Sequence, residues 1–145
     1  MKRILALVMV MALLIGVSSA ALGQNLAGAL GGNLGPGNYY VVGNIVLPPD
    51  SVLTIAPGTI ITAMGNYGFD VFGKIIAIGT QTDSIKFING GVSAWNGINI
   101  DSLSSDSSRF EYCVFEGSNC IGVDVEGCGP TFYNCLFTNC NSGGG

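Results

Sequence analysis

A short internal repeat constrains the fold of this chain more than any other feature. Residues 110–115 (FEYCVF) align with residues 132–137 (FYNCLF), so that Phe, Cys and Phe recur 22 positions apart. Two further matches recur at a spacing of 23: Leu53-Thr54-Ile55 with Ile76-Ala77-Ile78, and Asn99-Ile100-Asp101 with Gly122-Val123-Asp124. A fixed period in the low twenties indicates a solenoid. Leucine-rich repeats have a similar period, but Leu is too sparse here for their framework.

The pattern within each repeat favours β-strands over helices. From Tyr39 onward, short apolar runs alternate with Gly, Asn, Asp and Pro, and apolar residues never recur at helical spacing over three turns. We therefore predict an all-β solenoid of about 22–23 residues per coil, whose stacked coils pair in parallel about 4.8 Å apart. Like residues then stack on like: Phe110 over Phe132, Cys113 over Cys135, and Phe115 over Phe137. A bend near Tyr112 and Asn134 would let all three pairs face inward.

The N-terminus predicts export. Lys2 and Arg3 precede an apolar run over residues 4–17, and small residues follow at 18–21, which is the three-part form of a secretory signal. The run of 14 residues is short for a membrane span, which needs about 20. A buried helix or an uncleaved anchor is the alternative, and cleavage after Ala20, Ala21 or Gly23 stays open.

Three segments follow from this organisation. We predict a helical signal peptide over residues 1–21, an irregular Gly- and Asn-rich lead-in over 22–38, and a β-helix domain of about four or five coils over 39–145. The expected location is secreted or at the cell surface. Contact with a membrane is expected only through the signal peptide before cleavage.

Composition excludes several classes of chemistry. The chain has no His, so it can form no Ser-His-Asp triad, no Cys-His dyad and no His-ligated zinc site. The net charge is −4, and Lys74, Lys86 and Arg109 are the only cations beyond position 3. Nucleic acid is therefore not an expected partner.

Four pieces of the sequence, in order, resemble one family. Residues 53–61 (LTIAPGTII) resemble the opening coil of bacterial secreted right-handed parallel β-helix proteins, the pectate-lyase-like superfamily. Residues 73–80 (GKIIAIGT), followed by 83–87 (DSIKF), resemble their second coil, and Trp95-Asn96-Gly97-Ile98 resembles the Trp-x-Gly-Ile step that follows. The Phe-x-x-Cys-x-Phe segments resemble the Cys- and Asn-bearing coils.

The resemblance covers roughly residues 45–140 and implies a right-handed parallel β-helix. It implies adhesive, structural or carbohydrate-related roles, although the same fold carries pectate lyases and polygalacturonases. Family members normally run for many more coils, and residues 141–145 resemble the approach to another strand. We therefore expect the chain to be truncated at its C-terminus.

Carboxylates are the first candidates for chemistry: Asp101, Asp106, Glu111, Glu116, Asp124 and Glu126. Asp101 and Asp124 could stack on adjacent coils, where they would repel, raise one pKa or attract Ca²⁺. Solvated corner residues are the preferred interpretation. Arg109, the only Arg beyond the signal, is expected in a surface ion pair rather than as the base of a lyase.

Cysteines and aromatic residues are the remaining candidates. Cys120, Cys128, Cys135 and Cys140 lack the close Cys-x-x-Cys pairs of most zinc sites, so inward thiols or disulfides are expected. With five Cys, one thiol must be free or paired outside the chain. The aromatic candidates for sugar stacking are Trp95, Tyr39, Tyr40, Tyr67 and Tyr133, of which Tyr133 is the best outward candidate because inward Phe132 precedes it.

The sequence thus predicts a non-enzymatic structural or adhesive module of an exported bacterial protein. Its expected partner is an extracellular polysaccharide or another surface protein, and end-to-end self-association is a further expectation. No catalytic, metal or cofactor-binding residue is assigned. The alternative is an N-terminal fragment of a polysaccharide lyase or glycoside hydrolase whose catalytic coils are missing.

Overall fold

The computed structural model describes residues 23–92, 94–104, 107–119 and 122–141. The regular structure in these residues is entirely β-strand. The strands are β1 Gln24–Ala29, β2 Gly32–Leu34, β3 Gly37–Leu47, β4 Val52–Ile55, β5 Thr59–Ala63, β6 Gly68–Val71, β7 Lys74–Ile78, β8 Ile85–Asn89, β9 Gly97–Ile100, β10 Arg109–Glu111, β11 Cys113–Glu116, β12 Val123–Val125, β13 Thr131–Tyr133 and β14 Leu136–Thr138. The predicted signal peptide lies outside the described residues.

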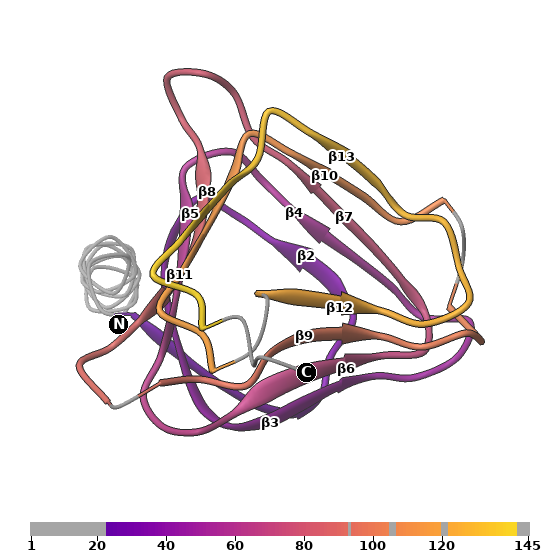
Figure 1. Cartoon of the computed structure of the whole chain (residues 1–145), viewed down its shortest axis with the longest axis horizontal. Coiled ribbons are helices and arrows are strands. Elements are labelled where there is room, and N and C mark those ends of the chain that lie inside the picture. Colours follow the sequence, from indigo (N-terminus) through magenta and orange to yellow (C-terminus); the bar gives the residue numbers. More distant parts are fainter. Residues whose placement is uncertain (1–22, 93, 105–106, 120–121, 142–145) are drawn as a thin grey trace, which may run out of the picture.

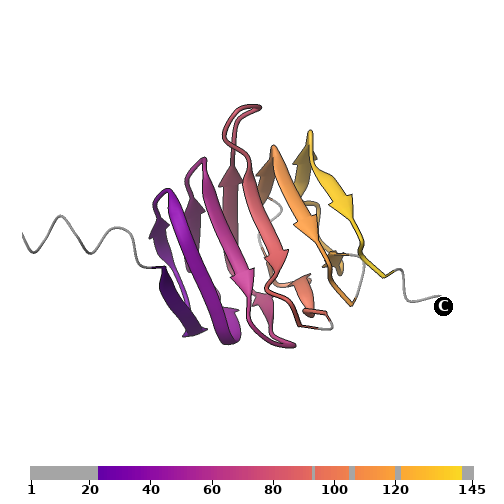
Figure 2. The same ribbon diagram turned by 90° about the vertical axis from the view of Figure 1, so that its left-hand side faces the viewer.

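The strands form two curled parallel sheets around a common interior, and the ribbon follows a triangular outline (Figure 1). One sheet has the order β13-β10-β7-β4-β2, and the other runs β12-β9-β6-β3-β5-β8-β11-β14, with β1 beside β3. Strand β3 bends between two sides, because its residues 37–41 pair with β5 and its residues 45–47 pair with β6. Figure 2 shows successive turns of chain stacked from the N-terminal to the C-terminal end. This arrangement is compatible with a β-solenoid.

The strand pairing confirms part of the predicted repeat. Phe110 pairs with Phe132, and Phe115 pairs with Phe137, both at the predicted spacing. The bend is also confirmed, because Tyr112 and Asn134 have φ values of 48° and 50°. A residue with positive φ breaks the strand alternation, so that inward Phe110 and Cys113 can flank it.

Two predicted alignments are wrong. Leu53 pairs with Ile75 rather than Ile76, since Leu53 and Ile75 are both fully buried and a shift of one residue would turn a strand inside out. Asp124 pairs with Asn99 rather than Asp101, at a spacing of 25. The coil length is not constant, because Ile76 pairs with Arg109, 33 positions further on. The extra residues are spread over the connections from β7 to β8, from β8 to β9 and from β9 to β10.

The prediction of an irregular lead-in is also wrong. Residues 22–38 contain β1, β2 and the start of β3. Leu26 and Leu34 point into the same interior as the later strands and are 8% and 7% exposed. The Gly and Asn residues around them suggested a loop, but Gly28 and Gly32 only supply the positive φ values at which this first turn bends.

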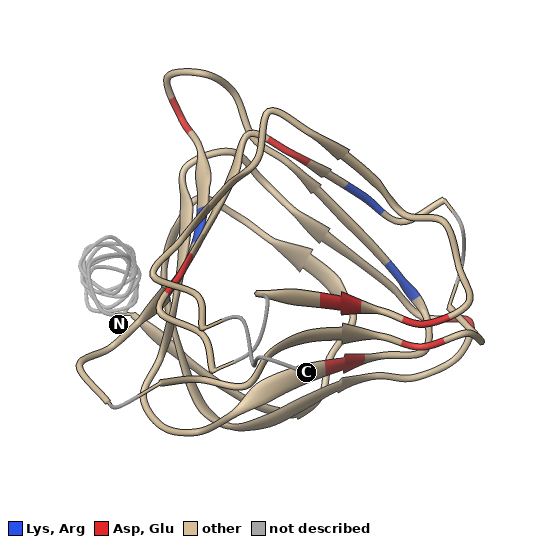
Figure 3. Ribbon diagram, viewed as in Figure 1, with Lys and Arg blue, Asp and Glu red and all other residues tan. Residues whose placement is uncertain are grey.

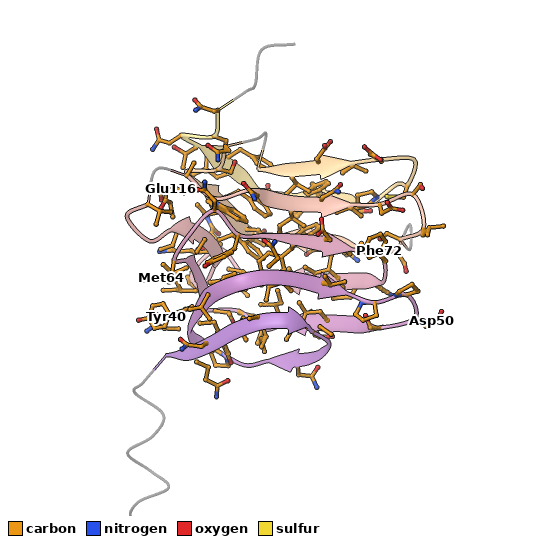
Figure 4. All side chains as sticks on the ribbon, turned by 90° about the horizontal axis from the view of Figure 1, so that it is seen from below. Tyr40, Asp50, Met64, Phe72 and Glu116 are labelled. Atoms are coloured by element: carbon orange, nitrogen blue, oxygen red, sulfur yellow. The ribbon has the colours of Figure 1, made fainter. Side chains whose placement is uncertain are left out.

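Aromatic rings fill the C-terminal half of the interior. Phe87, Phe115 and Phe137 stack with centroid distances of 5.0 and 4.8 Å, and Phe110 stacks on Phe132 at 5.0 Å. These distances match the spacing of hydrogen-bonded strands, so each ring lies over the ring of the preceding turn. Figure 4 shows side chains filling the space between the strands, with labelled residues such as Tyr40, Asp50 and Glu116 around the outside.

Candidate functional site

The outer face of β10 and β13 carries the most exposed aromatic side chain of the described residues. Tyr133 is 55% exposed and meets the ring of Tyr112 edge to face, with centroids 5.9 Å apart. Strand alternation positions it, because the neighbouring Phe132 points inward against Phe110. The prediction that Tyr133 faces outward is confirmed.

Charged groups lie beside this aromatic pair. Glu111 pairs with Tyr133 in the strand register and forms an ion pair with Arg109. The Arg109 side chain is 53% exposed and the Glu111 side chain is 14% exposed, so the guanidinium remains open to solvent. The predicted surface ion pair of Arg109 is confirmed. Tyr133, Tyr112, Glu111 and Arg109 together are called the tyrosine face below.

The other aromatic candidates lie mainly inside. Trp95 is 2% exposed, and its indole N–H donates a hydrogen bond to the carbonyl oxygen of Glu116 at 2.9 Å. Tyr39 is 9% exposed and donates its hydroxyl to the carbonyl oxygen of Gly35. Tyr40 and Tyr67 are half-buried. Trp95 and Tyr39 therefore serve the core rather than a sugar-binding surface.

Asp101 and Asp124 do not stack on adjacent strands, because Asp124 pairs with Asn99. Asp70, Asn99 and Asp124 form one outward row across β6, β9 and β12. The amide of Asn99 therefore separates the carboxylates of Asp70 and Asp124. Figure 3 shows acidic positions on both β6 and β12. Asp101 lies at a corner, where its Oδ1 accepts a hydrogen bond from the backbone N–H of Leu103 at 2.9 Å. This geometry removes the reason to expect Ca²⁺ between Asp101 and Asp124.

Three acidic candidates remain: Glu116, Glu126 and Asp106. Glu116 and Glu126 are exposed, and Asp106 lies outside the described residues. Within residues 23–92, 94–104, 107–119 and 122–141, no three His, Cys, Asp or Glu side chains lie close enough together to hold a metal ion.

The described cysteines bond through their thiols to backbone carbonyls of the preceding turn. Cys113 donates to Ala77 at 3.4 Å, Cys135 to Phe110 at 3.4 Å, Cys140 to Phe115 at 3.6 Å and Cys128 to Ile100 at 3.9 Å. Cys113 is buried and the other three are half-buried, which agrees with the inward thiols expected from the sequence. Cys120 lies outside the described residues.

Cys113 and Cys135 influence each other directly. A hydrogen bond between the two thiols, together with burial, raises the pKa of Cys113 well above its ordinary value. The same hydrogen bond lowers the pKa of Cys135 to about 6. A lowered pKa makes a thiol more reactive at neutral pH, because the thiolate is the nucleophile.

The C-terminal turn exposes an apolar hollow that the sequence did not predict. It has a volume of about 500 Å³ and is lined by Val123, Val125, Phe132 and Phe137. A smaller, more polar hollow of about 110 Å³ lies on the outer face over β6 and β9, between Asn44, Asp70, Asn96 and Asn99. Strands β6 and β9 place Asp70 beside Asn99 at a spacing of 29 residues, which the predicted period of 22–23 did not contain.

Comparisons with known proteins add no relative. No protein-family model, no curated protein and no solved structure matches the chain. No helix of the described residues is long and apolar enough to cross a membrane.

Proposed function

We propose that this chain is a non-enzymatic structural or adhesive module of an exported bacterial protein, folded as a right-handed parallel β-helix. Parallel strands that recur in one sheet through crossover connections are almost always joined in a right-handed sense, which supports this handedness. The sequence resemblance and the signal-like N-terminus support an exported, extracellular or cell-surface location.

We propose further that the module binds an extracellular polysaccharide through the tyrosine face. The single observation that carries this proposal is the exposure of Tyr133 beside Tyr112 on an outward strand surface. A tyrosine offers a flat apolar ring for the C–H face of a sugar and a hydroxyl for hydrogen bonding. The exposed guanidinium of Arg109 adds donors within the same face, and these suit hydroxyl or carboxylate groups of a glycan.

The test is affinity electrophoresis of the chain through gels containing soluble neutral and acidic polysaccharides. We expect retardation by at least one polysaccharide and a loss of at least about tenfold in affinity for Tyr133→Ala, because an exposed aromatic anchor dominates a small site. Tyr40→Ala is the matched control, since Tyr40 is a half-buried tyrosine on β3 outside the tyrosine face. Retardation that Tyr133→Ala leaves unchanged would contradict the proposed site, and release of reducing or unsaturated sugar ends would favour the enzyme alternative.

A further inference from the structure

Two cysteines lie one above the other at a corner of the stack. Cys113 and Cys135 are 22 residues apart, and the strand pairs on both sides of them, β10 with β13 and β11 with β14, have the same spacing. Each cysteine follows a corner residue with positive φ, Tyr112 or Asn134. The two thiols are hydrogen-bonded to each other, so this corner holds a pair of neighbouring sulfur atoms.

The other described cysteines occupy other places in the turn. Cys128 comes after β12 and Cys140 after β14, whereas Cys113 begins β11 and Cys135 directly precedes β14. The thiols of Cys128 and Cys140 bond to carbonyl oxygens of β9 and β11, respectively. Of the four described cysteines, Cys113 and Cys135 are therefore the two that share a corner.

The spacing of this pair suits a disulfide. Neighbouring strands lie about 4.8 Å apart, and the Cα atoms of a disulfide are about 4.4–6.8 Å apart. The thiols are already within hydrogen-bonding distance, so a bond between them requires rotation of the side chains rather than a large shift of the backbone. The hydrogen bond from Cys113 lowers the pKa of Cys135 to about 6, which supplies a thiolate at neutral pH.

We propose that Cys113 and Cys135 form a disulfide between adjacent turns when the folded protein meets a small-molecule disulfide such as oxidised glutathione. The thiolate of Cys135 attacks one sulfur atom of the small molecule, which forms a mixed disulfide and releases one small thiolate. The thiol of Cys113 then loses its proton and attacks the sulfur of Cys135, which forms the protein disulfide and releases the second small thiolate. The two cysteines are oxidised, the small-molecule disulfide is reduced to two thiols, and the two cysteine protons balance those that the released thiolates take up.

The inference concerns one cross-link and leaves the reduced structure as it is. In the reduced protein, the thiols of Cys113 and Cys135 keep their bonds to the carbonyl oxygens of the preceding turn. Disulfides persist in oxidising extracellular surroundings, so the inference rests on the exported location that we propose. It uses no property of the tyrosine face, and the two proposals can fail separately.

The experiment exposes the folded, reduced chain to oxidised glutathione and then alkylates the remaining thiols under denaturing conditions. Cleavage after Glu, Tyr and Phe places every cysteine on its own peptide for mass analysis. We expect the chain to lose the mass of two hydrogen atoms, the peptides of Cys113 and Cys135 to become linked, and both residues to lose their alkylation. Cys128 and Cys140 should remain alkylated.

Variants separate the two chemical steps. Cys113→Ala should stop at the mixed disulfide and retain one glutathione on Cys135, because the second thiol is missing. Cys128→Ala is the matched control and should form the cross-link to the same extent as the unsubstituted chain, since Cys128 lies at another corner. In urea the Cys113–Cys135 link should lose its preference over other pairings, because only the fold holds these two residues together.

Four outcomes would overturn the proposal. The first is a chain that shows the circular dichroism of a folded β-protein and keeps both thiols open to alkylation after the treatment. The second is an unsubstituted chain that retains glutathione on Cys135 without closing the link. The third is a cross-link that joins other cysteines, and the fourth is a Cys113–Cys135 link that forms with equal preference in urea. None of these outcomes affects the electrophoresis test of polysaccharide binding.

Discussion

The phenylalanine stack allows a sharp test of the fold, through the substitution Phe115→Ala. Phe115 is fully buried, and its ring stacks on Phe87 at 5.0 Å and on Phe137 at 4.8 Å and meets Phe110 edge to face at 5.8 Å. Truncating a buried Phe costs about 3–5 kcal/mol, and three ring partners favour the upper half of that range. Small domains have a total stability of about 5–15 kcal/mol, so the loss should be large but measurable.

Urea denaturation measures this cost. Trp95 is the only Trp, and it bonds to the backbone of Glu116, so its fluorescence reports directly on β11, while circular dichroism reports on all strands. With a slope of about 1–3 kcal/mol per molar urea, a loss of about 4 kcal/mol lowers the midpoint by roughly 1.3–4 M. Phe115→Leu keeps most of the volume and provides a measurable midpoint if the Ala variant does not fold.

Phe137→Ala is the matched control for this prediction. Phe137 belongs to the same stack but is 42% exposed at the open end, so its truncation should cost about 1–2 kcal/mol. An equal loss of unfolding free energy for both variants would refute the reasoning, because Phe115 would then be no better packed and no better shielded from water than Phe137.

Two further predictions follow from the glycines and the thiols. Gly97 has a φ of +77°, and a Cβ there would lie 2.7 Å from a backbone oxygen of the next turn, so Gly97→Ala should cost about 2–3 kcal/mol in thermal or urea denaturation. Gly28→Ala, at the same φ but with open space around it, should cost only about 1–2 kcal/mol, and equal losses would show that the close approach of the turns does not matter. Alkylation of Cys135 followed by peptide mass analysis should slow as the pH falls through about 6, where its thiolate is protonated. Cys113→Ala removes the thiol donor and should move this midpoint upward toward the ordinary value of 9.0, and an unchanged midpoint would exclude the hydrogen bond as its cause.

The sequence predicted the repeat most accurately where no residues are inserted between turns. The segments around Phe110 and Phe132 are separated by a single uninterrupted turn, so their side chains repeat in both type and spacing. The turn from Ile76 to Arg109 is longer because residues are inserted between its strands. Spacing alone does not tell how many residues lie outside the paired strands. Only burial on one face fixes the register there, and burial depends on neighbours from other turns.

The candidate site was predictable to the same extent. Tyr133 follows from strand alternation beside Phe132, which is a local property of the sequence. The row of Asp70, Asn99 and Asp124 depends on two inter-turn registers that local alternation does not determine. The ion pair of Arg109 with Glu111 was partly predictable, because residues two apart on one strand share a face.

The cysteine positions connect the repeat to its local chemistry. Each of Cys113, Cys135 and Cys140 follows a residue with φ between 48° and 51°, and each of these residues lies two positions after a Phe. The positive φ turns the chain at a corner of the stack, and the thiol then points back to a carbonyl of the preceding turn. A thiol is small and only weakly polar, so it can be buried at such a corner at little cost. This arrangement recurs at three corners, which favours a packing role for these cysteines over a disulfide framework. It also explains why the cysteine spacing follows the turns of the chain rather than the Cys-x-x-Cys pairs of most zinc sites.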